Sequence, residues 1–394
     1  MPVNYKRLVS LYEQKDAGEA SETLAEALAA REVDAKSIDL GRLFEECFGW
    51  QAFRDCRRKE KLVHDVYAEA LTENQGAVHT GAFLNIIGQI VYSMTLDAYN
   101  EVANVFTPLI PEQNTAFLDG EKIAGVTEIG DEIQVRDEGN PYAIAGVGEN
   151  WIFTPSLKDR GLTIPVTWEA LFADRTGQVQ TRCADVGKWG GRNREKRAID
   201  CVIDENTTAH RYNWRGTVIA TYGDNSGSHS WDNLAASNGL VDWLNVNTAE
   251  QNVNALTDPF TGEVVDFEMT HLVVTKQLEQ TARRIVRLGT IKFTTPGYAT
   301  SGNVSQHAGD NPYAQKYEVV TSKLLAPRLA TDTDWFLFNP SKYARYMVAE
   351  KANVTQAPSN SHEEFHRRIV QQYRFNERGA YTVIDGRAAH KSTA

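Results

Sequence analysis

The sequence predicts an α+β fold, in which a helical N-terminal part is followed by a β-rich segment, a long helix and a mixed body. Apolar residues recur at helical spacing in residues 5–72 and 81–106. Residues 119–168 instead alternate apolar and polar residues, as strands do. Residues 173–205 return to helical spacing, and short strand and helix patterns alternate after them.

The N-terminal part is predicted to be helical over residues 5–72. Its clearest apolar stripe has helical spacing and consists of Leu40, Leu43, Phe44, Cys47 and Phe48. Asp39 or Ser37 can cap the start of that helix. We interpret residues 30–37 as a charged linker, and the basic run at 54–61 as a solvated helix face rather than a nucleic-acid patch.

A second apolar helix is expected over residues 81–106, with Pro108 and Pro111 ending it. The β-type runs 125–135 and 151–168 then flank a stretch rich in Gly, Asn and Pro, which predicts a long two-stranded hairpin with an irregular tip. An isolated two-stranded ribbon is marginal in water. The ribbon is therefore expected to lie on its own domain or on a neighbouring subunit.

The long helix at 173–205 has Asp174 as a plausible cap. Its stripe is formed by Val179, Arg182, Cys183, Val186, Trp189, Ala198, Cys201 and Val202. Gly187, Gly190 and Gly191 interrupt it, each at a cost of about 1 kcal/mol relative to Ala. They indicate a kink, a close packing contact or a break. We favour a bend or break over a phosphate loop, because GKWGGR matches neither a Walker loop nor a Rossmann turn.

The remaining elements are expected in this order: a polar loop at 223–233, a helix at 239–256, a strand at 271–275 followed by a helix to 289, a loop at 295–313, strands at 316–325 and 333–340, a short helix or strand at 341–350, and a closing strand pair within 365–389. The closing pair is expected to turn at NERG, residues 376–379. The sequence shows no internal repeat and no low-complexity tract.

Composition narrows the possible functions. The 394 residues suffice for roughly two to three domains. The net charge of −11 argues against a free-standing nucleic-acid binder. The scattered cysteines Cys47, Cys56, Cys183 and Cys201 are interpreted as free thiols in a reducing compartment. The N-terminus is too polar for a signal peptide, and the longest apolar run, 82–94, is shorter than the ~20 residues that span a bilayer. The protein is expected to be cytoplasmic when made.

One motif suggests an enzyme. Residues 362–366 read His-Glu-Glu-Phe-His and fit H-E-x-x-H, the zinc-binding pattern of metallopeptidases. The flanks are strongly charged, and the next candidate ligand, His390, lies far along the chain. We therefore interpret the motif as a polar turn before a strand, with the zinc peptidase as a remote alternative.

No other pattern indicates catalysis. There is no G-x-S-x-G, Walker or G-x-G-x-x-G motif. Isolated polar residues are interpreted as structural or solubilising: His210, His229, His271, His307, Glu128, Asp131 and Glu132. The tryptophans Trp189, Trp214, Trp243 and Trp335 are interpreted as core or interface anchors. We predict no enzymatic activity, no cofactor, and no catalytic or metal-binding residue.

Three stretches resemble the major capsid protein of tailed phages, with its Hong Kong 97-type fold. Residues 158–203, which contain TWEALFAD, look like the end of an extended loop entering a spine helix. Residues 256–286, LTDPFTGEVVDFEMTHLVVTKQLEQTARRIV, are similar to the Mu-like head subunit group. WFLFNP at 335–340, with the closing segment that ends in Asp-Gly-Arg-Ala, resembles the closing pattern of the family.

The resemblance covers roughly residues 80–390 and implies a division of the chain. The expected parts are an N-terminal helical segment and N-arm (1–118), an extended loop (119–170), a peripheral domain with the spine helix (171–222), a mainly axial domain (223–350) and closing strands that return to the peripheral domain (351–394). Residues 1–75 depart from the family pattern, so the resemblance gives no expectation about N-terminal cleavage.

The resemblance also implies partners. The subunit is expected to form hexamers and pentamers of an icosahedral shell around double-stranded DNA, bound without sequence specificity. Portal, scaffold and decoration proteins are further expected partners, and a membrane is not. An encapsulin-like compartment and a phage tail or baseplate protein remain as alternatives.

Overall fold

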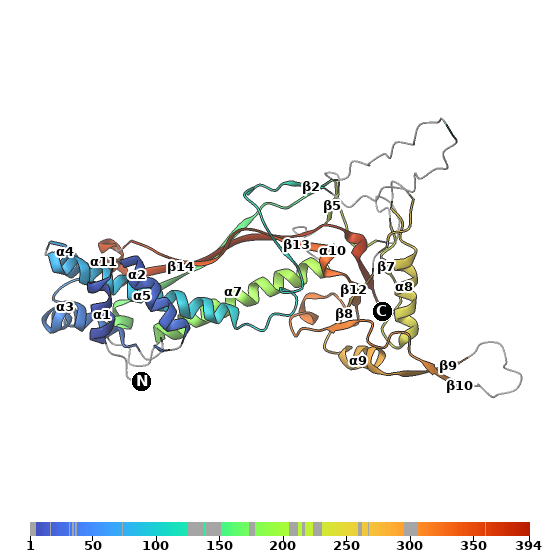
Figure 1. Ribbon diagram of the computed structural model, residues 1–394, viewed down its shortest axis with the longest axis horizontal. Coiled ribbons are helices and arrows are strands. Elements are labelled where there is room, and N and C mark those ends of the chain that lie inside the picture. Colours follow the sequence, from blue (N-terminus) through green and yellow to red (C-terminus); the bar gives the residue numbers. More distant parts are fainter. Residues whose placement is uncertain are drawn as a thin grey trace, which may run out of the picture. The chain divides into compact units, whose positions relative to one another are not determined.

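The structure is a computed structural model of the 394-residue chain (Figure 1). It describes all residues except 1–4, 16, 31, 34, 36–37, 73, 125–137, 139–150, 173–177, 205–211, 215–216, 224–230, 259–261, 267, 295–305 and 359. Expectations for Ser37, Asp174, His210, His229, Glu128, Asp131, Glu132 and most of the 223–233 loop lie outside the described residues. No described helix has the length and apolar character needed to cross a bilayer.

The described helices are α1 (Tyr5–Gln14), α2 (Ala17–Ala29), α3 (Leu40–Arg57), α4 (Val63–Thr72), α5 (Asn74–Asn100), α6 (Trp168–Phe172), α7 (Gln178–Ile203), α8 (Trp243–Asn254), α9 (Glu279–Arg287), α10 (Pro340–Tyr343) and α11 (Ser361–Arg367), with 3-10 turns η2 (Ala326–Arg328) and η3 (Gly386–Ala388). The strands are β1 (Glu112–Asn114), β2 (Lys122–Ala124), β3 (Trp151–Phe153), β4 (Lys158–Thr167), β5 (Tyr212–Trp214), β6 (Thr217–Ile219), β7 (Leu234–Ala235), β8 (His271–Val274), β9 (Thr290–Thr294), β10 (Gln306–Asp310), β11 (Glu318–Val320), β12 (Trp335–Phe338), β13 (Ala344–Gln356), β14 (Ile369–Val383) and β15 (Ala389–Ser392).

The chain forms two compact units. Unit 1 comprises residues 1–103, 159–193 and 350–378, and unit 2 comprises 104–158, 194–349 and 379–394. Helix α7 and strands β13 and β14 contribute residues to both units. The α+β class predicted from the sequence is therefore confirmed, with helices concentrated in unit 1 and most strands in unit 2.

The core of unit 1 confirms the helical prediction for residues 5–72. Leu43 and Phe44 are fully buried, and the Phe44 ring lies 5.4 Å from that of Phe83 in α5 and 5.2 Å from that of Phe172 in α6. Asp39 caps α3, as predicted, because its side chain accepts hydrogen bonds from the N–H groups at the start of that helix. The N-terminal helices thus share one core with α6, α7, β4 and β14.

Unit 2 is built around a five-stranded sheet with the strand order β11-β8-β12-β15-β7. All four residues of β12 are buried. Phe336 and Phe338 belong to one apolar core, whereas Trp335 and Leu337 belong to a second core that contains α8 and α9. Because successive strand residues point to opposite faces, this alternation shows that both faces of the sheet are covered.

The helix expected at 81–106 begins and ends earlier than predicted. Helix α5 covers Asn74–Asn100, so neither Pro108 nor Pro111 ends it. Residues 306–310, expected to be loop, form β10, which pairs antiparallel with β9. This pair is a two-stranded sheet that leaves the end of α9 as a hairpin (Figure 1). The β9–β10 pair was not predicted, because apolar and polar residues alternate too weakly in the strand sequences TIKFT and QHAGD.

The predicted turn at residues 376–379 is wrong. Strand β14 runs without interruption through them. Gly379 serves a close approach instead, since a Cβ there would lie 2.5 Å from the hydroxyl oxygen of Tyr346 on β13. A glycine in a strand marks either a turn or such a contact, and sequence alone did not separate the two.

The extended loop at 119–168 also differs from the lone ribbon that was expected. Strands β2 and β3 pair antiparallel, but β3 also pairs with β5, giving the four-stranded sheet β2-β3-β5-β6. Strand β4 joins a different sheet, with the order β1-β13-β14-β4. The described strands of this segment therefore find partners in their own chain, so of the two supports expected for the ribbon, its own chain rather than a neighbouring subunit holds these strands. The predicted tip lies mostly outside the described residues.

Candidate functional site

The H-E-x-x-H motif forms α11, a seven-residue helix, and not the polar turn that was expected. The rings of His362 and His366 lie side by side, 4.3 Å apart, on exposed residues. Glu363, the residue that would be the general base, forms an ion pair of 3.3 Å with Arg367. Among the described residues, no group of three or more His, Cys, Asp or Glu side chains could hold a metal ion. Within the described residues, α11 therefore brings its two histidines together without a third ligand.

The buried residue of this motif is Glu364, which has a structural contact within unit 1. Its two carboxylate oxygens accept hydrogen bonds from the backbone N–H groups of Val63, at 2.6 Å, and His64, at 2.8 Å. These N–H groups belong to the first turn of α4, where a helix leaves donors without internal partners. Glu364 thus caps α4 across a large sequence separation, a role that the motif gave no means of finding.

The glycines of α7 permit close helix packing. Within unit 1, a Cβ on Gly187 would lie 2.1 Å from the carbonyl oxygen of Thr95 in α5, and one on Gly190 would lie 2.7 Å from the Phe375 ring in β14. The helix continues through both residues. Of the three possibilities left open by the sequence, the close packing contact is confirmed and the break between two helices is wrong. The space that a side chain would fill is occupied by neighbouring backbone and aromatic atoms.

A second buried carboxylate fixes the connection after α5. Glu195 in α7, 2% exposed, accepts hydrogen bonds from the N–H groups of Val105 and Phe106, both at 2.9 Å. Its other oxygen accepts from the N–H of Thr107 at 3.0 Å and from the hydroxyl of the same residue at 2.8 Å. One side chain therefore orders three consecutive backbone N–H groups in unit 2.

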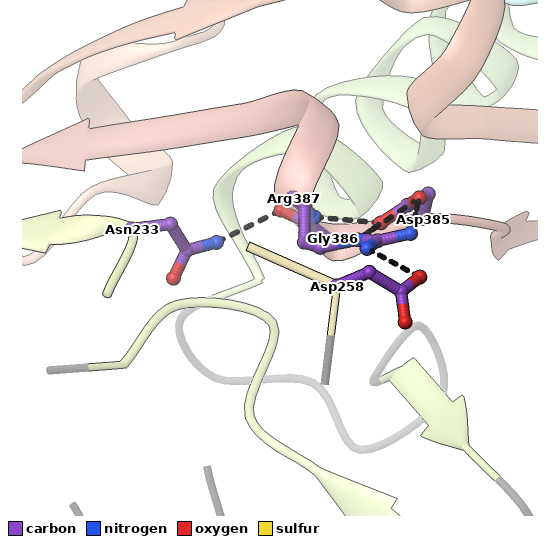
Figure 2. Close-up of polar contacts among 5 residues, drawn as sticks. All are labelled: Asn233, Asp258, Asp385, Gly386 and Arg387. Atoms are coloured by element: carbon purple, nitrogen blue, oxygen red, sulfur yellow. Dashed lines mark hydrogen bonds and ion pairs between the residues drawn. The ribbon is translucent and has the colours of Figure 1, made fainter. Parts of the chain in front are cut away.

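The closing Asp-Gly-Arg-Ala segment forms a buried ionic cluster in unit 2 (Figure 2). Asp385 accepts hydrogen bonds from the Nε and Nη2 atoms of Arg387 at 3.0 and 2.9 Å, and Asp258 accepts from Nη1 at 3.2 Å. The Asn233 amide donates to the carbonyl oxygens of Gly386 and Ala389. These contacts tie the segment to the loops before and after α8.

The cluster holds one buried cation between two buried carboxylates. Burial by itself lowers the pKa of Arg387, but the hydrogen bonds and negative charges of Asp385 and Asp258 outweigh it, so that the pKa lies above its ordinary value. The guanidinium therefore stays charged between two buried carboxylates. The cluster is a structural anchor, because every group in it is used by another group in it.

The cysteines and the tryptophans can now be placed. All four thiols are free and buried, and burial raises the pKa of Cys47, Cys56 and Cys183 to about 12. Such thiols stay protonated and unreactive at neutral pH. Trp335 is fully buried and donates from Nε1 to the Asn238 carbonyl oxygen, as expected of a core anchor. Trp189 is 56% exposed and is not a core residue.

Two of the four histidines interpreted as structural lie in described strands. His271 in β8 is hydrogen-bonded to Thr270 at 2.7 Å and lies 3.5 Å from Glu318. Burial lowers its pKa, and Glu318 offsets this only in part. His307 lies in β10. Among the described residues, His271 belongs to no group that could hold a metal ion.

The surface of the described chain offers contacts for other macromolecules. Large apolar side chains are exposed on several elements: Phe117, Leu118, Leu162, Val241, Leu244, Leu288 and Phe365. The β9–β10 pair is a second candidate, because a two-stranded sheet with no further strand partner in the described part is marginal by itself.

Comparison with known proteins identifies the matching family. A family model described as "Phage capsid protein" matches residues 152–392, more than half of the chain. No curated protein sequence matches.

Solved structures with similar folds come from several sources. A virus-like particle from Pyrococcus furiosus aligns over 76% of this chain and 97% of its own, with 9% identity and a TM-score of 0.39. The capsid of cyanophage P-SCSP1u aligns over 74% and 88%, with 11% identity and a TM-score of 0.42. A structure from Mycobacterium phage Adephagia aligns over 74% and 90%, with 13% identity and a TM-score of 0.41. Membership of the phage capsid protein family therefore rests on the family model and not on these structural alignments.

Proposed function

This chain belongs to the phage capsid protein family, and we propose that it is the major head subunit of a tailed double-stranded DNA phage or prophage. As a member of a capsid family, it is a structural component of the virion and not an enzyme. The observation that carries the proposal is the family match over 152–392, which includes α7, the five-stranded sheet and the closing ionic cluster.

The proposed assembly is an icosahedral shell of hexamers and pentamers. Closed shells arise when one subunit repeats the same few contacts around symmetry axes, so that many modest contacts add up. The exposed apolar residues and the β9–β10 hairpin supply surfaces for such contacts. In this arrangement residues 171–222 belong to the peripheral domain with α7 as the spine helix, and residues 223–350 form most of the axial domain. Of the closing residues 351–394, the first part returns to the peripheral domain, whereas β15 belongs with the axial sheet of β7, β8, β11 and β12.

The finer assignment to the Mu-like head subunit group is part of the proposal. It depends on residues 256–286, in which Leu272 and Val274 are core residues and α9 follows β8 in the expected order. Portal, scaffold and decoration proteins are the proposed protein partners. Packaged double-stranded DNA is the proposed content, and the net charge of −11 lets it be enclosed without being held tightly by the shell as a whole.

Electron microscopy of the expressed full-length chain tests the function. Closed particles, or hexameric and pentameric rings that close on concentration, are expected. Tubes or stacked rings would support a tail protein instead. A stable monomer at high concentration would contradict assembly altogether. Closed particles containing protein cargo but never DNA, recovered from phage-infected cells, would favour the encapsulin-like alternative.

A deletion tests the extended loop separately. Replacing residues 125–150 with a two-residue Asn-Gly turn leaves β2, β3 and β4 with their partners in the same chain, because Ala124 and Trp151 are opposite each other in the antiparallel β2–β3 pair. We expect a soluble subunit with unchanged thermal stability that assembles poorly. Normal shells from this variant would show that the extended loop is not an assembly contact, while leaving the capsid function itself intact.

A further inference from the structure

Helix α7 has two faces of opposite character in its unit 1 part. One face carries Gly187, Gly190 and Gly191 and packs closely on α5 and β14. The residues about half a turn away are exposed and are Arg182, Asp185, Lys188, Trp189 and Arg192. At 3.6 residues per turn these side chains share one side of the helix. The glycine contacts fix which side faces outward.

The exposed side is cationic and unpaired. Arg182, Lys188 and Arg192 carry positive charge against the single negative charge of Asp185. None of the three cations takes part in an ion pair within the part of the chain that the structure describes. Such a group of exposed cations is unusual in a chain whose net charge is −11. Exposed cations are normally scattered among an equal number of carboxylates, so an excess of three cations over one carboxylate on one side of a helix points to an anionic partner.

Trp189 restricts the position of the Arg192 side chain on this surface. The Arg192 guanidinium carbon lies 5.3 Å from the centroid of its ring, a cation–π distance, and the Trp189 side chain is 56% exposed. The ring therefore supports the guanidinium from one side and leaves its N–H groups free to donate. A planar guanidinium held in this way suits the oxygens of a phosphate group.

We propose that this surface, the α7 basic face of Arg182, Lys188, Trp189 and Arg192, binds the phosphate backbone of duplex DNA. The inference rests on the proposed function, because packaged DNA is the polyanion that a shell subunit meets. From Arg182 to Arg192 the helix advances about 15 Å, which places three cations along a few consecutive phosphates. The contact is sequence-independent and weak, so the acidic remainder of the subunit keeps the DNA from being held tightly.

The test measures binding of the purified, unassembled full-length chain to a fluorescent DNA duplex of about 30 base pairs by anisotropy, as a function of salt. For three phosphate contacts, the plot of log affinity against log salt concentration has a slope of about −3. The variant Lys188→Glu/Arg192→Glu should bind about tenfold or more weakly at low salt, with a slope shallower by about 2. Trp189→Ala should weaken binding less and leave the slope unchanged, since no charge is removed.

A matched control applies the same change of charge elsewhere. Lys323→Glu/Lys351→Glu alters two exposed lysines outside α7 and should leave DNA binding close to that of the unmodified chain. Equal weakening by both double variants would mean that only net charge matters, and would overturn the proposal. So would the absence of duplex binding at low salt.

Assembly of the same variants separates this inference from the proposed function. Lys188→Glu/Arg192→Glu should form particles as the unmodified chain does. If it binds DNA normally but fails to assemble, the face contacts a second copy of the chain and the DNA inference is wrong. If the unmodified chain forms no particles, the proposed function fails, whatever the DNA measurement shows.

Discussion

The carboxylate of Glu364 in α11 accepts a hydrogen bond of 2.6 Å from the backbone N–H of Val63, at the start of α4. Both groups are buried, so removing the carboxylate takes the Glu364 hydrogen bond away from the Val63 N–H and from the part-buried N–H of His64. We expect Glu364→Ala to lower the free energy of unfolding by roughly 1–3 kcal/mol. Chemical denaturation followed by circular dichroism measures this.

Glu363→Ala is the matched control for that prediction. It removes a neighbouring carboxylate whose contact with Arg367 is a partly exposed i,i+4 ion pair, worth only about 0.3–0.5 kcal/mol. Equal destabilisation by the two variants would mean that Glu364 does not cap α4 in solution.

The histidines of the same helix are expected to be dispensable. His362 and His366 are exposed and belong to no described group that could hold a metal. Replacing both with Ala should change the free energy of unfolding by no more than about 0.5 kcal/mol and leave assembly as it is. Metal analysis of the purified chain is expected to find no stoichiometric zinc, and one zinc per chain, lost in the double variant, would restore the peptidase hypothesis.

The sequence predicted elements well where one periodicity dominated. The Leu43–Phe44 stripe, the Asp39 cap and the order of strand and helix around His271 all correspond to described structure. Local patterns failed where a distant contact decides the conformation. Gly379 is required by Tyr346 but was assigned to a turn, and Gly187 is required by the Thr95 carbonyl, for which close packing was only one of three possibilities.

In the candidate site, too, the sequence predicted the local segment but not the residues that reach it from far along the chain. The resemblance located the closing Asp-Gly-Arg-Ala segment, but it gave no indication that Asp258, 129 residues from Arg387, completes the cluster. Glu364 and Glu195 were not singled out, since a carboxylate that binds backbone N–H groups has no sequence signature. The basic face of α7 could not be predicted from the sequence, because it can be recognised only once the structure shows that the opposite face, with its glycines, is buried.

Gly187 provides a test of helix packing. A methyl group there would meet the Thr95 carbonyl oxygen at 2.1 Å, so Gly187→Ala must push α5 and α7 apart within unit 1. The expected loss is about 1–3 kcal/mol. Gly81→Ala in α5 is the control, because nothing lies within 4 Å of its added Cβ, and a gain of up to about 1 kcal/mol is expected from helix propensity. Thermal unfolding temperatures that move the same way in both variants would contradict this packing.

Arg387 is expected to be among the most sensitive positions. Arg387→Ala leaves Asp385 and Asp258, whose side chains are only 2% and 1% exposed, without their counter-charge. Breaking a buried ion pair in this way costs about 3–5 kcal/mol. Arg374→Ala, at an exposed arginine of β14, should have little effect. Equal soluble yield and equal denaturation midpoints for the two variants would contradict the anchoring role.

His390 makes stability depend on pH. It is fully buried in β15, and burial lowers its pKa to about 4, whereas the unfolded chain titrates near 6.5. Between these values the unfolded chain binds a proton that the folded chain does not, so stability falls as the pH falls. The expected loss from pH 7 to pH 4 is roughly 3 kcal/mol. His390→Gln should remove this part of the dependence, and His362→Ala should retain it. A parallel pH profile for His390→Gln would disprove the assignment.

The position of β15 in its sheet has a consequence for synthesis on the ribosome. Residues 389–392 lie between β12 and β7, and they are made after every other strand of that sheet. A nascent chain that stops before them leaves β12 with an open edge and Trp335 and Phe336 without their neighbour. Translation products that terminate early therefore lack the strand that joins β12 to β7 and cannot complete the core of unit 2.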